Sequence, residues 1–215
     1  MLELPSVKSG FKLRSSQEEM ITVFEKYMKA QGIALSDEEI KLIGAAATEK
    51  TVPRKQTLLQ AGEICRFKLF VITGFLRTYR IGADGNEYIM KFSPELTWTT
   101  EGESYTNRIQ SAYYIDTLED SQLMMWSRDQ FDALHNQIPA LKTFSDQLIS
   151  RNLYSSQNRL YKVISSTPEE KYEDFIKTYP GILLRVPLRM VASYLGVSVK
   201  TLTRIRQSQL QRSLK

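Results

Sequence analysis

The stretch LRMVASYLGVSVKTLTRIRQ, residues 188–207, has the pattern of two short helices joined by a tight turn. Ala192 is a small residue in the middle of the first helix, where the second helix must pack closely. Gly196, four residues later, accepts the positive φ angle that such a turn requires. Ser198 is a residue type that caps helix N-termini. The stretch therefore predicts a helix-turn-helix.

The second helix of this motif enters the major groove of DNA by its N-terminal part. Apolar residues stand where they would fill the angle between the two helices: Val191, Leu195, Val197, Leu202 and Ile205. Between them, Arg204 is the candidate for bidentate contact with guanine. The predicted DNA contacts are Arg189, Ser198, Val199, Lys200, Thr201, Thr203, Arg204 and Arg206. Those predicted to contact phosphate and position the helix are Arg189, Ser198, Thr201 and Arg206.

Charge is distributed unevenly along the chain. The last acidic residue is Asp174. The positive residues after it are Lys177, Arg185, Arg189, Lys200, Arg204, Arg206, Arg212 and Lys215. Since the chain carries +5 and this segment +8, residues 1–174 carry −3. A basic end on a mildly acidic body is typical of a DNA-binding tail domain.

The composition excludes several other classes of protein. A single cysteine, Cys65, and a single histidine, His135, cannot form a zinc site, an iron–sulfur site or the histidine-held metal centre of a cupin enzyme. No apolar run approaches the roughly 20 residues of a membrane-spanning helix. Residues 1–20 lack the apolar core of a secretory signal. We therefore expect a cytoplasmic protein of 215 residues that is not an enzyme, contains no metal or cofactor and does not contact a membrane.

The distribution of residue types along the chain predicts an α+β fold. Residues 16–50 have helical spacing, with a capping box at Ser36 and Glu39. From residue 51 to about 127, short segments rich in β-branched and aromatic residues predict antiparallel strands, and Ala83-Asp84-Gly85-Asn86 predicts a hairpin between two of them. This predicts an N-terminal antiparallel β-roll, similar to a jelly roll. No βαβ alternation and no glycine-rich phosphate loop occur, which argues against a nucleotide hydrolase or a Rossmann dehydrogenase.

Residues 139–165 predict one long helix, because the segment has no glycine and no internal proline. Its apolar residues predict a single stripe formed by Leu141, Phe144, Leu148, Ile149, Leu153, Leu160 and Ile164. Such a stripe packs either on its own domain or on a second copy of itself, and its position before a basic helical domain favours dimerisation. Thr167 is predicted to cap the next helix, with Pro168 at its first position.

A β-roll, a long helix and a terminal helix-turn-helix together resemble the Crp/Fnr family of bacterial transcription regulators. The resemblance implies a sensor domain at 1–136, a dimerisation helix at 137–165 and a DNA-binding domain at 166–215. SVKTLTRIR, residues 198–206, looks like the family's recognition helix, with Arg204 at its main base-contacting arginine. The apolar Val199 departs from the family pattern, so the usual site sequence is not expected. The short QRSLK end resembles a branch without the β-hairpin wing.

The same resemblance implies an effector pocket in the β-roll. Gly102-Glu103 matches the pair that contacts the ribose of cyclic nucleotides, but Gln110-Ser111-Ala112 lacks the arginine that binds the cyclic phosphate. A buried phosphate without its cation is poorly compensated, so we do not expect cyclic AMP. The candidate pocket residues are Gly102, Glu103, Ser104, Arg108, Gln110, Ser111, Ala112, Ser155 and Ser156.

The implied partners are double-stranded DNA, a second copy of the chain, RNA polymerase and an unidentified small effector. Two alternatives remain open. One is the same fold with a vestigial pocket and control by abundance alone. The other is a protein-binding module that uses the basic tail for an acidic partner, which the salt dependence of DNA binding would distinguish.

Overall fold

The computed structural model describes the backbone of residues 9–213 and the side chains of residues 18–209 and 211. Lys215 and the Arg212 side chain, counted above in the basic segment, lie outside these described residues. Two helices, α1 (Ser9–Ala30) and α2 (Asp37–Ala45), precede the sheets. The predicted capping box is confirmed, because the Ser36 hydroxyl accepts from the Glu39 N–H at 3.2 Å and the Glu39 carboxylate from the Ser36 N–H at 2.7 Å.

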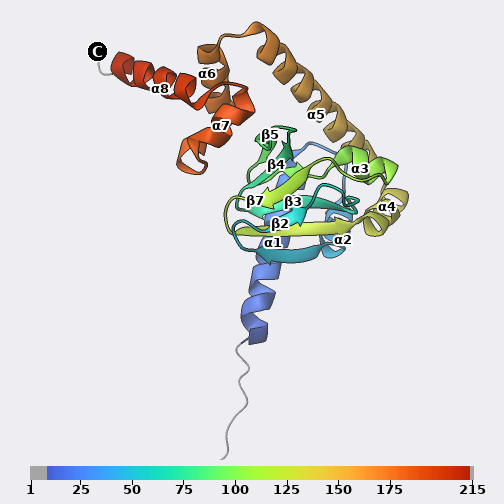
Figure 1. Cartoon of the computed structure of the whole chain (residues 1–215). Coiled ribbons are helices and arrows are strands. Elements are labelled where there is room, and N and C mark those ends of the chain that lie inside the picture. The colour runs from blue at the N-terminus through green and yellow to red at the C-terminus, as the bar shows by residue number, and fades with distance from the viewer. Residues whose placement is uncertain (1–8, 214–215) are drawn as a thin grey trace, which may run out of the picture.

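The centre of the protein is a β-roll of two antiparallel four-stranded sheets, ordered β1-β8-β3-β6 and β2-β7-β4-β5. The strands are β1 (Thr48–Val52), β2 (Thr57–Leu59), β3 (Phe67–Thr73), β4 (Leu76–Ile81), β5 (Glu87–Ser93), β6 (Trp98–Thr99), β7 (Tyr114–Thr117) and β8 (Ser121–Ser127). The predicted hairpin is confirmed, since β4 pairs with β5 across the turn and Gly85 has φ +76°. Figure 1 shows the roll below an arch of C-terminal helices.

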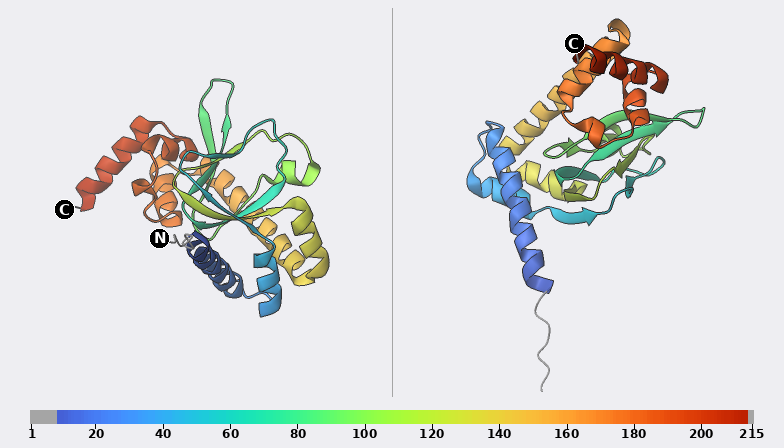
Figure 2. Two further views of the ribbon diagram at one scale, coloured as in Figure 1. Left: turned by 90° about the horizontal axis from the view of Figure 1, so that it is seen from below. Right: turned by 90° about the vertical axis from the view of Figure 1, so that its left-hand side faces the viewer.

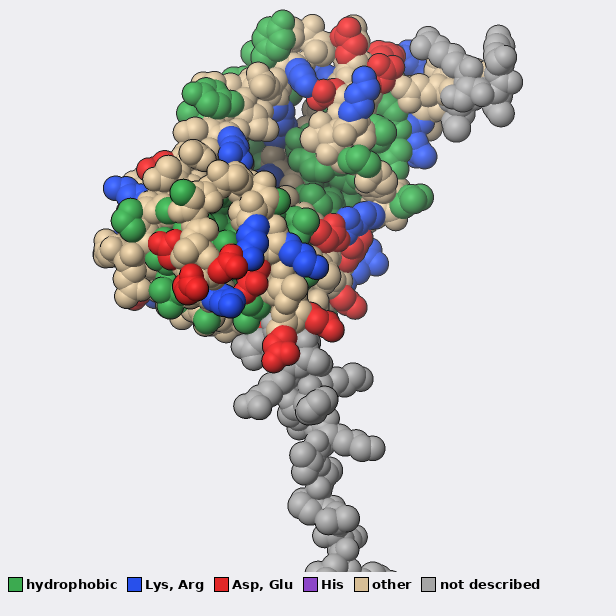
Figure 3. Space-filling view, turned by 180° about the vertical axis from the view of Figure 1, so that it is seen from behind, with side chains coloured by type: hydrophobic (Ala, Val, Ile, Leu, Met, Phe, Trp, Pro, Cys, Tyr) green, Lys and Arg blue, Asp and Glu red, His purple; other side chains and the backbone are tan. Residues whose placement is uncertain are grey.

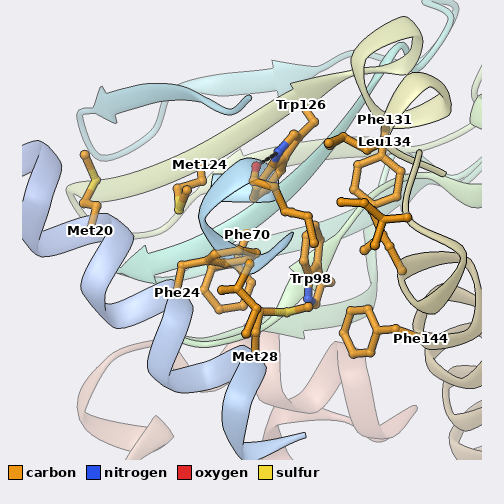
Figure 4. Packing of buried hydrophobic residues seen from close by; sticks show 14 of the residues in the cluster. Met20, Phe24, Met28, Phe70, Trp98, Met124, Trp126, Phe131, Leu134 and Phe144 are labelled. Carbon is orange, nitrogen blue, oxygen red and sulfur yellow. Dashed lines mark hydrogen bonds between the residues drawn. The ribbon is translucent and has the colours of Figure 1, made fainter. Parts of the chain in front are cut away.

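Three apolar clusters hold the fold together. Between the sheets, residues from both of them pack around Leu69 and Ile115. The outer face of the first sheet packs on α1, α2, α4 (Arg128–Gln137) and the start of α5, around Phe24, Trp98 and Trp126 (Figure 4). Figure 2 shows these helices along one side of the roll. The third cluster joins the second sheet to the C-terminal helices.

The long helix α5 spans Pro139–Ser165, as predicted. The prediction that its apolar residues form one stripe is wrong. Leu141 and Phe144 are buried and Leu148 packs beside them on the first cluster, whereas the later members are 55–77% exposed. The reason is that Ile149 follows Leu148 by about 100° of rotation, so the stripe divides there into two faces. The exposed set, Ile149, Leu153, Leu160 and Ile164, is called the outer stripe below.

Three C-terminal helices follow α5: α6 (Pro168–Thr178), α7 (Leu188–Leu195) and α8 (Val199–Ser213), with a 3₁₀ turn at Ile182–Leu184. Thr167 caps α6 as predicted, and Pro168 occupies its first position. The first helix of the motif, α7, docks on the edge of the roll. The Ser193 hydroxyl donates to the Glu87 carbonyl at 2.7 Å and accepts from the Ile89 N–H at 3.0 Å. The helix-turn-helix is thus fastened to the β4–β5 hairpin.

Arg185 makes the main ionic contact between the C-terminal helices and the roll. Its guanidinium donates to Glu95 at 2.7 and 2.9 Å, to Glu119 at 2.6 and 2.9 Å and to the Gly74 carbonyl at 3.2 Å. Although Arg185 belongs to the basic segment, its positive charge is paired with carboxylates of the protein itself. These hydrogen bonds hold the pKa of the Glu95 carboxyl below its usual value of 4.5.

We expect Arg185→Gln to lower the free energy of unfolding by about 2 kcal/mol at neutral pH, because charge-assisted hydrogen bonds are lost. The folded pKa of Glu95 is lowered, so its contribution is complete above the unfolded value of 4.5 and disappears as the pH falls through the folded value. The difference in stability between wild type and variant should therefore shrink with acidification below 4.5. Urea unfolding measures it, with Arg80→Gln, an exposed arginine of β4, as control. A difference that is independent of pH would contradict the role of Glu95.

Candidate DNA-binding interface and effector region

The turn between α7 and α8 has the predicted geometry. Ala192 is 2% exposed, and the Val197 N–H donates to its carbonyl at 3.0 Å. Gly196 has φ +66°. The Ser198 hydroxyl accepts from the Thr201 N–H at 3.0 Å, which is the capping contact expected of the residue before α8.

The face that α8 presents to solvent is the one predicted. Leu202 and Ile205 are 0% and 2% exposed and pack on α6 and α7. Val199 is 46% exposed, and the Arg204 side chain is 75% exposed. Lys200 and Thr203 are also exposed. Figure 1 shows α8 projecting away from the roll.

The polar residues of this face differ in the hydrogen bonds and ion pairs that they already make. The Thr203 hydroxyl donates to the Val199 carbonyl at 2.9 Å, and the hydroxyls of Ser198 and Thr201 lie 2.8 Å apart and are hydrogen-bonded. Arg204 is 4.0 Å from Glu169 on α6, an exposed pair that holds the guanidinium weakly. Lys200 and Arg204 are therefore the cations of this face that other residues hold least.

Two predicted phosphate contacts are placed differently from the rest. Arg206 is half-buried and lies beside Tyr172 of α6, whose hydroxyl has its pKa raised by burial while Arg206 opposes that shift. Arg189 is exposed at the start of α7 and lines a cavity with Glu87 and Ile89 of the β4–β5 hairpin. Both residues remain predicted phosphate contacts. Arg189 stands next to the roll, and Arg206 also supports the packing of α8.

The predicted effector residues of the roll surround a short helix, α3 (Gly102–Asn107). Gly102 begins it and Glu103 is exposed. The buried acid is Glu101, 8% exposed, whose carboxylate accepts from the N–H groups of Glu103 and Ser104 at 3.2 and 2.8 Å. A carboxylate therefore already occupies the N-terminal donors of α3. The sequence match of Gly102-Glu103 to the family's Gly-Glu pair does not predict this role of Glu101.

The two buried serines of the region make hydrogen bonds with the backbone. The Ser104 hydroxyl accepts from the Cys65 N–H at 2.8 Å and donates to the Ile109 carbonyl at 2.6 Å. The Ser111 hydroxyl bonds the N–H and the carbonyl of Tyr113 at 2.9 and 3.1 Å. The remaining members in the roll, Gly102, Glu103, Arg108, Gln110 and Ala112, are exposed.

The structure does not gather the predicted effector residues around one cavity. Arg108, at φ +57°, lines a cavity of about 390 Å³ with Cys65, Arg66 and Arg128. Ser155 lines a different one, about 430 Å³ in volume, between α5 and the C-terminal helices. Ser156, the next residue of α5, is exposed.

A further cavity, which the sequence did not indicate, lies between the roll and the start of α5. It has a volume of about 90 Å³, and its walls include Lys68, Lys91 and Phe144. Burial lowers the pKa of each of the two lysines to about 8. The Lys91 ammonium donates to the Trp98 carbonyl at 2.9 Å, and that of Lys68 lies 4.1 Å from the centroid of the Phe131 ring. Isolated lysines in strands give no sequence signal that predicts this placement.

Comparison with known proteins agrees with this architecture. The family model described as "Cyclic nucleotide-binding domain" matches residues 49–137, the β-roll and α4. The regulatory protein HlyX of Actinobacillus pleuropneumoniae is 24% identical over 183 residues, covering 80% of this chain and 75% of its own. The fumarate and nitrate reduction regulatory protein of Yersinia pestis is 22% identical over 168 residues, covering 73% and 66%. These matches support the resemblance of the chain to the Crp/Fnr family of transcription regulators.

Solved structures agree on the fold. FixK2 from Bradyrhizobium japonicum superimposes with a TM-score of 0.68 at 17% identity, covering 78% of this chain and 85% of that one. The c-di-GMP-responsive global regulator CLP of Xanthomonas campestris has a TM-score of 0.68 at 12% identity, covering 83% of this chain and 94% of that one. The predicted α+β fold is therefore confirmed. Among residues 9–213, no helix is long and apolar enough to cross a membrane.

We expect cyclic AMP to leave the thermal midpoint of this protein unchanged. Gln110 brings no charge to a phosphate, Glu101 fills the donors of α3, and both buried serines bond backbone groups. A ligand at a hundred times its dissociation constant would stabilise the protein by about 2.7 kcal/mol, which thermal unfolding detects easily. A clear rise of the midpoint with excess cyclic AMP would show that Arg108 or another group compensates the phosphate.

Proposed function

We propose that this protein is a homodimeric Crp/Fnr regulator that binds a two-fold-symmetric operator, with α8 of each protomer in the major groove. The observation that carries the proposal is the face of α8. Leu202 and Ile205 are buried against α6 and α7, while Val199, Lys200 and Arg204 are exposed near its N-terminal end. That part of a recognition helix contacts base edges.

The outer stripe supports a dimer through α5. Ile149, Leu153, Leu160 and Ile164 are 62%, 55%, 60% and 77% exposed in one chain. Apolar residues spaced by four and seven on an exposed helix match the contact seam of paired helices. Sequence-specific DNA binding also favours a dimer. One short helix makes few base contacts, whereas the two helices of a dimer bind half-sites about 34–36 Å apart. Within this proposal α5 is the dimerisation helix between a sensor domain and a DNA-binding domain.

Effector control is a separate part of the proposal. The resemblance to Crp/Fnr regulators and the cavities beside α5 support a small-molecule effector other than cyclic AMP, and RNA polymerase is the proposed partner at promoters. The vestigial-pocket alternative is favoured by Ser104 and Ser111, whose hydroxyls already bond the backbone.

Binding to DNA at graded salt tests the proposal against the protein-binding alternative. Each phosphate that the protein neutralises contributes about −0.9 to the slope of log affinity against log salt. If Lys200, Arg204 and Arg206 of each protomer contact phosphate or base edges, the slope for a duplex is steep, and Lys200→Gln reduces it. The absence of duplex binding at low salt by a protein that is folded and dimeric would overturn the proposal.

A further inference from the structure

A groove against the C-terminal helices lies between the second half of α5 and helices α6 and α7. Its volume is about 430 Å³, within the range of small-molecule pockets. Figure 3 shows it as a hollow between α5 and the C-terminal helices, with positively charged side chains at its edge. It lies outside the β-roll, and of the predicted effector residues only Ser155 lines it.

One wall of the groove is aromatic. The rings of Phe175, Tyr179 and Tyr194 are mutual neighbours, with centroids 5.2, 5.3 and 6.0 Å apart. Phe92 of β5 extends this cluster into the roll. Tyr154, 63% exposed on α5, also lines the groove. Such walls suit a planar ring, which would stack or pack edge-on against them.

The lining is also strongly positive. Four of its residues are cations, Arg151, Arg159, Lys162 and Lys171, against the single carboxylate of Asp174. The Lys162 ammonium pairs with Asp174 at 2.5 Å. The other three bond neutral groups: Arg159 the carbonyls of Ile89, Met90 and Tyr194, Lys171 the carbonyl of Val163 and Arg151 the amide oxygen of Gln31. Three positive charges of the lining are therefore left uncompensated by these contacts.

The groove stays open in the proposed dimer. Arg151, Asn158 and Lys162 line the groove, and each is followed two positions later by a member of the outer stripe: Leu153, Leu160 and Ile164. Two positions on a helix are about 200° of rotation, so the two sets lie on opposite sides of α5. The outer stripe can pack on a second copy while the groove faces its own helix-turn-helix.

We propose that this groove binds a small aromatic anion, a planar ring carrying a phosphate, sulfonate or carboxylate group. The ring packs on Tyr154 and the Phe175–Tyr179–Tyr194 cluster, and the anionic group meets Arg151 and the neighbouring cations. A molecule there touches α5, α6 and α7 at once. It therefore fixes the orientation of the helix-turn-helix relative to the dimerisation helix, a consequence for DNA affinity that rests on the proposed function.

Calorimetric titration of the full-length protein tests the site directly, with three probes: 1-naphthyl phosphate, 1-naphthol and inorganic phosphate. We expect 1-naphthyl phosphate to bind one molecule per chain, at least about tenfold more tightly than either of its parts. Arg151→Gln and Tyr154→Ala should each weaken it about tenfold. Both residues are exposed, so the variants should fold as the wild type does.

An exposed arginine and an exposed tyrosine that do not line the groove provide matched controls. Arg80→Gln removes an exposed arginine from β4, and Tyr161→Ala removes a tyrosine of α5 that is 68% exposed and does not line the groove. Both should leave binding within about twofold. Absence of binding by 1-naphthyl phosphate, equal binding of inorganic phosphate, or equal loss in the control variants would each overturn the site. DNA affinity with and without the probe is then a second readout, and its failure would count only against the coupling.

Discussion

Arg204→Ala is expected to remove most of the preference for operator over random DNA while the protein stays folded and dimeric. A bidentate arginine–guanine contact is worth about 1–3 kcal/mol of discrimination, and a symmetric dimer loses two of them. The ratio of specific to non-specific affinity should therefore fall by about 30-fold to 10⁴-fold. The Arg204 side chain is 75% exposed and its ion pair with Glu169 spans 4.0 Å, so the free energy of unfolding should change by less than about 0.5 kcal/mol.

Competition binding against random duplex measures this ratio for wild type, Arg204→Ala and the control Arg80→Ala. Lys200→Ala distinguishes the two cations of the exposed face of α8, because a phosphate contact lowers affinity for every sequence alike. Undiminished preference in Arg204→Ala would remove this residue from base recognition.

Leu153→Glu together with Leu160→Glu is expected to dissociate the dimer. Both side chains are more than half exposed in one chain, so burying them against a partner contributes about 1.5–3 kcal/mol each, and glutamates at the seam repel one another. The dissociation constant of the dimer should rise at least about 10³-fold, and operator binding should fall with it.

Sedimentation velocity over a range of concentrations measures this. The matched control is Leu42→Glu with Leu184→Glu, two leucines that are 46% and 94% exposed and lie outside α5. Leu148 is avoided, because it packs on the first apolar cluster and its substitution would disturb the roll. A double variant at 153 and 160 that remains a dimer would place the dimer contact elsewhere.

The features that were predictable from sequence depend on neighbours along the chain. Gly196 and Ser198 determine the turn through a backbone angle and a cap within three residues. Pro139 begins α5 and Thr167 caps α6 in the same local way. The β-branched and aromatic residues of the two strands and the Asp84-Gly85 turn predict the hairpin, because its register depends on residues that are close in sequence.

The features that were missed depend on contacts between distant residues. Ser104 is tied to Cys65, 39 positions away, and Arg185 to Glu119 and Glu95, 66 and 90 positions away. No local pattern reveals that a serine or an arginine is already engaged in this way. The sequence pattern predicts one long apolar stripe on α5 because Leu148 and Ile149 are adjacent in sequence. In the structure these two side chains face different surfaces, so the outer stripe is separate.

Selection from a random duplex library, with the purified wild-type protein, tests the central claim most directly. The proposal predicts an enriched two-fold-symmetric sequence whose half-sites are separated by about 10–10.5 base pairs, one helical turn, and a guanine position in each half-site that Arg204→Ala no longer selects. An enriched pool without symmetry, or one in which Arg204→Ala selects the same sequence as the wild type, would contradict binding of DNA by a pair of α8 helices.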